Sequence, residues 1–107
     1  MTIKMASMVL APVLALVPAT GQAETSFKER METCKAIERL AESVMSARQR
    51  GMAMSKMLEI VNDGEPNELV NAMVMDAWDK PRYSTERHQQ RSISDYRDAA
   101  FGACMDR

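Results

Sequence analysis

The chain has 107 residues and a nearly balanced charge, with 14 lysines and arginines against 15 aspartates and glutamates. A chain of this length has room for one small domain with a modest core. The charge balance argues against a general nucleic-acid binder, because such proteins usually carry a strong basic excess.

The first 23 residues have the layout of a secretory signal peptide. Lys4 is followed by an uncharged apolar run over 5–17, and small residues stand at the −3 and −1 positions of a cut after Ala23. The run is shorter than the roughly 20 residues that span a bilayer, and its prolines weaken it as a membrane helix. We expect a signal peptide over 1–23, a single helical domain over 24–107, no stable membrane insertion after cleavage, and a periplasmic or secreted protein.

A long helix is expected at the start of the mature sequence. Apolar residues recur every three or four positions, which predicts a helix over about 25–50, and Gly51 is suited to its C-terminal stop. Charged residues of both signs occupy the remaining positions and form a solvated face. The apolar stripe consists of Phe27, Met31, Cys34, Ile37, Leu40, Ala41, Val44, Met45 and Arg48.

Two shorter helices are expected next. Ser55 is a candidate N-cap for a helix from Lys56 to about residue 61 or 62, which the Asn-Asp-Gly turn at 62–64 ends. Pro66 suits the first turn of the third helix, and Pro81 stops that helix from continuing past residue 80. The buried stripe of this third helix is expected to be Leu69, Val70, Met73, Val74, Ala77 and Trp78.

The fourth helix is expected to begin at an N-cap formed by Ser84 or Thr85, with Glu86 in its first turn. Its stripe is Ile93, Tyr96, Ala100, Phe101 and Cys104. No alternating β-branched run supports a strand. The pattern predicts an all-α, irregular four-helix, bundle-like domain, in which the first and last helices are long and the middle two are shorter.

The two cysteines predict one disulfide, Cys34–Cys104. Both lie on apolar stripes, one early in the first long helix and one near the end of the last helix. Bridging them requires these helices to run antiparallel. The chain-entropy model assigns such a large loop about 4 kcal/mol. The alternatives are buried free thiols, a disulfide between two chains, and a catalytic pair of a cysteine with His88, which a disulfide would prevent.

Methionine is frequent, with 11 in the chain. Met52, Met54 and Met57 are near enough in sequence to offer thioether ligands to Cu(I), but adaptable core filling is the preferred interpretation. The oxygen-rich stretch 62–68 lacks the residue order of a calcium loop. We therefore expect neither a metal site nor a cofactor.

Charge is segregated along the second half of the chain. Residues 59–79 contain six acids and no base, and residues 80–97 contain five bases and two acids. The two segments either neutralise each other within the fold or present a bipolar surface to a partner. The residues expected to contact an anion or a partner are Lys80, Arg82, Arg87, His88 and Arg91.

The sequence contains no phosphate loop, nucleophile elbow or His-Glu-x-x-His motif. We therefore expect a small exported interaction protein that binds another exported or envelope protein. A small-anion or ligand-binding protein is the alternative, and an enzyme comes third.

Overall fold

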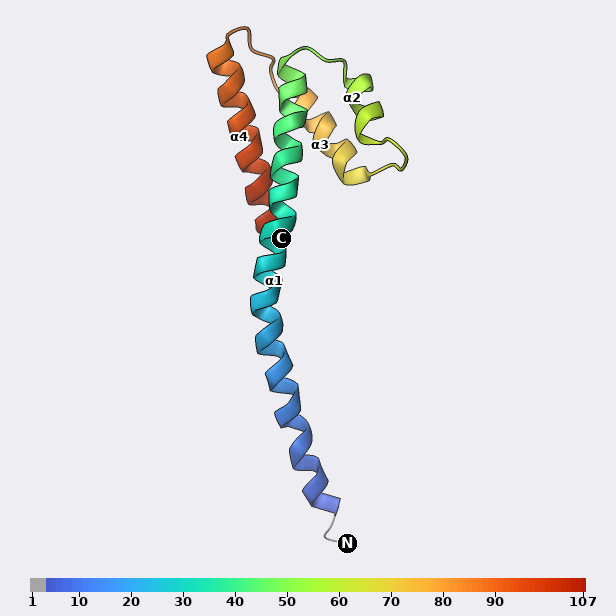
Figure 1. The fold of residues 1–107 in the computed structure, drawn as a ribbon, viewed down its shortest axis with the longest axis vertical. Helices are drawn as coiled ribbons and strands as arrows, with labels where there is room; N and C mark the ends of the chain where they lie inside the picture. The colour runs from blue at the N-terminus through green and yellow to red at the C-terminus, as the bar shows by residue number, and fades with distance from the viewer. Residues whose placement is uncertain (1–3) are drawn as a thin grey trace. The chain divides into compact units, whose positions relative to one another are not determined.

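The computed structural model describes the backbone from Lys4 to Arg107 and the side chains from Ser26 onward. It contains α1 (Lys4–Gln49), α2 (Met54–Val61), α3 (Glu68–Trp78) and α4 (Glu86–Met105), and the described residues include no strand (Figure 1). The all-α prediction is confirmed. The chain divides within α1 into two compact units, 1–33 and 34–107. The disulfide and the buried core lie in the second unit.

The predicted disulfide is present. Cys34 and Cys104 are joined with their Cα atoms 5.6 Å apart. Further along α1, Glu38 and Glu42 contact Arg97 of α4, and Gln49 contacts Ser92. In these contacts, higher residue numbers on α1 pair with lower residue numbers on α4. The two helices therefore run antiparallel, side by side (Figure 1).

The ends of α1 test the prediction for the first helix. Its expected start near residue 25 is wrong, because α1 begins at Lys4. The stretch 4–24 is rich in Ala, Leu and Met, which are strong helix formers. The expected stop is confirmed. Gly51 has a φ of 89°, and its N–H donates to the Arg48 carbonyl while that of Met52 donates to Ala47. This is the Schellman arrangement, which glycine adopts without steric strain.

The predicted starts of α2 and α3 are also wrong. α2 begins at Met54, one residue before Ser55, and its N-cap Ala53 makes no side-chain cap. α3 begins at Glu68 after Asn67, whose side chain accepts the N–H of Val70 at 3.1 Å. Pro66 therefore precedes the helix, because asparagine supplies the capping oxygen that proline lacks. The Thr85 cap of α4 is confirmed.

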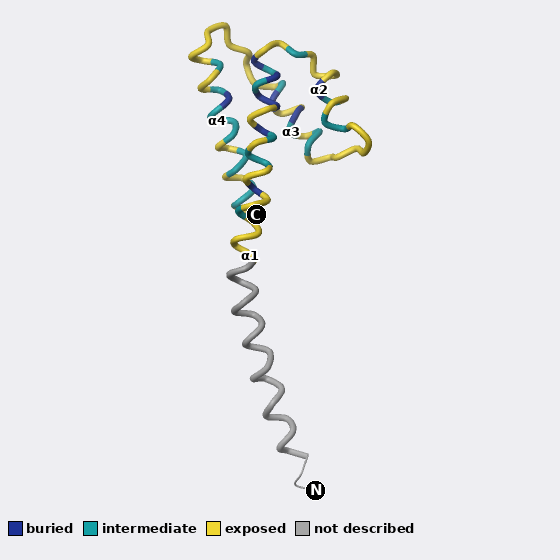
Figure 2. Tube along the Cα trace, viewed as in Figure 1, coloured by how far each residue is buried: buried dark blue, intermediate teal, exposed yellow. Residues whose placement is uncertain are grey.

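Each helix contributes to the core, in which buried residues are dark blue in Figure 2. Met45 and Met57 are buried, as their interpretation as core residues predicted. The expected burial of Phe27 and Leu69 is wrong, since they are 57% and 45% exposed. Periodicity identifies an apolar face of a helix but not whether another element covers it. The core cluster comprises Val44, Met45, Ala47, Met57, Val74, Ala77 and Ile93.

Candidate functional site

A buried glutamine at the end of α1 fixes the loop 79–85 that leads into α4. Gln49 is only 2% exposed. Its Nε2 donates to the carbonyl of Pro81 at 3.0 Å, and its Oε1 accepts the N–H of Tyr83 at 2.8 Å. Both halves of the buried amide are therefore satisfied by the loop backbone, which is what burial of a polar group requires. The loop that carries part of the predicted basic site is thus held against α1.

Two arginines strengthen the same connection. The guanidinium of Arg48 donates to the carbonyl of Lys80 at 2.9 and 3.2 Å. Arg82 Nε donates to the carbonyl of Gln49 at 3.2 Å, and its guanidinium lies so close to Gly51 that a Cβ there would be 2.7 Å from Nη2. Arg82, one of the predicted contact residues, is thus directed toward the end of α1.

Three of the predicted residues are brought together at the start of α4. Lys80, His88 and Arg91 line a surface hollow of about 430 Å³, together with Pro81, Tyr83, Ser92, Asp95 and Ala99. The ring centroids of His88 and Tyr83 are 5.8 Å apart, and His88 Nδ1 lies 2.6 Å from the hydroxyl of Thr85. The hollow combines cationic groups and hydroxyls with one carboxylate, so it is suited to a small anion or to a charged side chain.

Arg87 and Arg91 lie four positions apart on α4, and both are exposed. In the described part of the chain neither forms an ion pair with Asp76, Asp79 or Glu68. Among the described residues the two charged segments are joined by one ion pair, Lys80–Asp76 at 3.7 Å. Most of the segregated charge is therefore not neutralised by contact between the segments.

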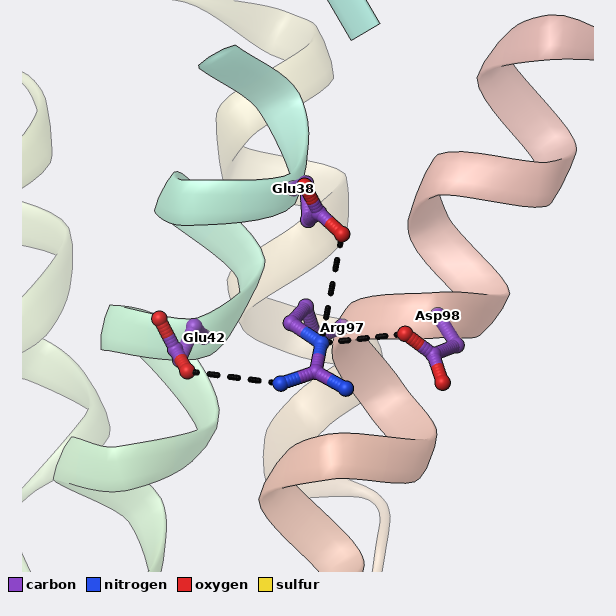
Figure 3. Close-up of polar contacts among 4 residues, drawn as sticks. All are labelled: Glu38, Glu42, Arg97 and Asp98. Atoms are coloured by element: carbon purple, nitrogen blue, oxygen red, sulfur yellow. Dashed lines mark hydrogen bonds and ion pairs between the residues drawn. The ribbon is translucent and has the colours of Figure 1, made fainter. Parts of the chain in front are cut away.

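The last base of the basic segment has a different role. Arg97 reaches from α4 to Glu38 and Glu42 of α1 at 3.9 and 3.7 Å, and it contacts Asp98 at 3.0 Å (Figure 3). The hydrogen bond with Asp98, with the charge of that carboxylate, raises the pKa of the Arg97 guanidinium. The guanidinium stays charged at every physiological pH, so this cluster joins the two long helices.

An apolar groove of about 410 Å³ lies where α1, α3 and α4 meet. The hydroxyl of Tyr96 donates to the carbonyl of Met73 at 2.8 Å and so links α4 to α3. Burial, followed by the charge of Asp76, raises the pKa of Tyr96 above the ordinary value of 10.0. The groove is lined by Ile37, Leu69, Ala72, Met73, Asp76, Tyr96, Ala99, Ala100, Ala103, Cys104 and Arg107.

Sequence reasoning did not identify this groove. The available signal was the group of small residues at helical spacing, Ala99, Ala100 and Ala103, opposite Ala72. Small side chains leave space between neighbouring helices that larger ones would fill.

The described residues contain no group of three histidine, cysteine or acidic side chains that is able to hold a metal ion. Of the three methionines considered for copper, Met57 is buried in the core, Met52 packs against it and Met54 is exposed. Within the described residues we also find no helix with a stretch long and apolar enough to cross a membrane.

Neither a protein-family model, a curated protein nor a solved structure matches the chain.

Proposed function

We propose that the protein is a small exported interaction protein that holds an acidic partner protein on the basic side of α4. The observation that carries this proposal is that the side chains of Arg87 and Arg91 are available to a partner. Both are exposed, lie about one helical turn apart and form no ion pair within the described residues. Two such guanidinium groups can each form paired hydrogen bonds with a carboxylate.

The neighbouring bases show why Arg87 and Arg91 are singled out. Arg48 and Arg82 donate to backbone carbonyls, and Arg97 binds acids on α1. These three side chains stabilise the fold, so replacing any of them changes the fold as well as the surface charge. Arg87 and Arg91 have no such contact in the described structure. A partner can therefore bind them without breaking an interaction within the fold.

Two observations support an exported location. The first 23 residues combine a basic start, a short apolar run and small residues before Ala23, as signal peptides do. The Cys34–Cys104 disulfide fits an oxidising compartment, where such bonds persist. We propose that residues 24–107 act in the periplasm or outside the cell. The absence of a recognisable catalytic motif from the sequence favours binding over catalysis.

A second candidate function is binding of a small anion. The observation that favours it is the convergence of Lys80, His88 and Arg91 on one hollow. Asp95 lines the same hollow, and Lys80 already pairs with Asp76, which reduces the net positive charge there. Phosphate titration monitored at His88 by NMR tests this candidate; saturable shifts support it, and unchanged resonances exclude a phosphate site.

Capture of a partner at increasing salt tests the favoured proposal. The oxidised mature protein is immobilised and exposed to envelope extract, and bound proteins are identified at each ionic strength. We expect a specific acidic protein whose retention declines with salt, because exposed charges are screened beyond about 8 Å at physiological ionic strength. Retention independent of salt, or capture of no specific protein, contradicts the proposal.

A further inference from the structure

Within the described unit 34–107, the exposed side of α3 carries three apolar residues beside the two acids Glu68 and Asp76. Leu69 is 45% exposed and Met75 is 58% exposed, and Ala72 between them is exposed as well. Leu69 and Ala72 also line the apolar groove that α3 forms with α4 and α1. A protruding leucine therefore lies at the edge of a hollow whose α4 wall consists largely of alanines, Ala99, Ala100 and Ala103. The unit 34–107 thus carries both an exposed apolar side chain and a groove that can accept such a side chain.

The groove also carries opposite charges at its two ends. In Figure 1, α3 rises toward the loop 79–85 and α4 descends from it, so the two helices run in roughly opposite directions. The hydrogen bond between Tyr96 and Met73 fixes their register. Asp76 lies about one turn beyond Met73 toward the loop, whereas Arg107 lies about three turns beyond Tyr96 in the opposite direction. Both side chains line the groove.

We propose that this groove binds a second copy of the chain in a twofold symmetric dimer. In a twofold interface each contact occurs twice, with the two roles exchanged between the copies. Leu69 of each copy then enters the alanine-walled part of the groove of the other, and Asp76 of each faces Arg107 of the other. Asp76 of α3 and Arg107 after α4 thus form between two copies an ion pair that they do not form with each other within one. This inference goes beyond the proposed function.

The dimensions of the face set the expected strength of the dimer. α4 has 20 residues and α3 has 11, so the helices are about 30 and 16 Å long and about 10 Å wide. On that basis the face offers about 450 Å² per copy, or about 900 Å² in the dimer, which is below the roughly 1,200–2,000 Å² of stable specific interfaces and in the range of weak, transient contacts. We therefore expect reversible association in the micromolar to millimolar range rather than a permanent dimer.

Mixing two charge-reversed variants provides the test. In Asp76→Lys the new lysine faces Arg107 of the other copy, and in Arg107→Glu the new glutamate faces Asp76. Each variant alone therefore places like charges opposite each other at both symmetric contacts. A mixed dimer has an opposite-charge pair at each contact. Sedimentation velocity over a concentration series of the oxidised protein measures association for each variant and for the equimolar mixture.

We expect association to weaken about tenfold in each variant, which corresponds to ~1.4 kcal/mol, and to return to the wild-type level in the mixture. Glu59→Lys on α2, which makes the same charge change as Asp76→Lys, is the matched control and should associate like wild type. The proposal is overturned if the wild type stays monomeric throughout the series, or if the mixture associates no better than its components. A monomer whose groove instead binds a segment of another protein also overturns it.

A second pair of variants guards against loss of the fold in Asp76→Lys, which also removes the Lys80 ion pair. Leu69→Glu should weaken association without lowering the melting temperature, because Leu69 is exposed in the monomer. Ile60→Glu, on the similarly exposed side chain of α2, should leave association unchanged. Equal association of Leu69→Glu and wild type contradicts the dimer. Partner capture through Arg87 and Arg91 is a separate measurement, so the two proposals fail independently.

Discussion

The side-chain oxygen of Gln49 accepts the backbone N–H of Tyr83 at 2.8 Å, although 34 positions separate the two residues. The amide nitrogen of the same side chain donates to the carbonyl of Pro81. One buried side chain at the end of α1 therefore holds the loop 79–85 by two backbone groups. The position of the hollow lined by Lys80, His88 and Arg91 depends on this connection.

Gln49→Leu should destabilise the fold by about 1–3 kcal/mol, because it removes two part-buried hydrogen bonds to the backbone of the loop 79–85. Urea unfolding of the oxidised protein measures the change. Gln89→Leu is a suitable control: Gln89 is less buried and donates one hydrogen bond, to the carbonyl of Tyr83. We expect it to cost about 0.5–1.5 kcal/mol. Equal effects of the two substitutions would show that Gln49 has no special role.

Removal of the disulfide should lower stability considerably. The bond joins two cysteines that are 70 positions apart in the sequence, Cys34 and Cys104, and loss of such a bond typically costs ~2–5 kcal/mol. The double substitution of serine for both cysteines should therefore lower the melting temperature by many degrees in a domain of this size. Calorimetry of both proteins gives the shift, and an unchanged melting temperature would mean that the bond contributes nothing.

The stability of the fold should decline at alkaline pH through Tyr96. Burial raises the pKa of this hydroxyl, so the folded state favours the protonated form. The resulting stabilisation is complete below the pKa of an unfolded tyrosine, about 10. It is lost as the pH rises from there toward the pKa of the folded state.

Urea unfolding at a series of alkaline pH values checks this dependence. Tyr96→Phe should flatten the decline, and Tyr83→Phe, at a side chain that is 39% exposed, should leave it unaltered. A decline that is equally steep in wild type and Tyr96→Phe would exclude Tyr96 as its source.

Export should remove the first 23 residues. Intact-mass analysis of protein recovered from the periplasm should show a chain that begins at Glu24 and lacks two hydrogens because of the disulfide. A full-length species retained in the inner membrane would contradict both the cleavage and the proposed location. Substituting Ala23 with a bulky residue should reduce cleavage, because the site requires a small side chain.

The sequence predicted the features that depend on local chemistry and spacing. Helical periodicity predicted the all-α fold, Gly51 predicted the end of α1, and two cysteines on apolar stripes predicted both the disulfide and the antiparallel helices. It did not predict the role of Gln49, because a polar residue near a helix end is usually solvated. The prediction that Leu69 lies in the core was wrong, because a periodic pattern does not show which apolar face remains uncovered.

The candidate site was also predicted only where it depends on local charge and spacing. The sequence singled out five residues by charge and spacing, of which three line one hollow and Arg82 is directed toward α1. A backbone carbonyl as the partner of an arginine leaves no trace in the sequence pattern. The apolar groove was also missed, because it arises from the packing of three helices rather than from a local motif.

In the proposed function Arg87 and Arg91 serve a partner rather than the fold, and one double variant, Arg87→Ala with Arg91→Ala, measures both roles. We expect partner capture to fall strongly while the free energy of unfolding changes by less than about 0.5 kcal/mol, as for ordinary surface changes. Lys35→Ala with Arg39→Ala removes two exposed bases at the same spacing on α1 and should leave capture intact. Lower stability with unaltered capture in the Arg87 and Arg91 variant would show that these arginines serve the fold and not a partner.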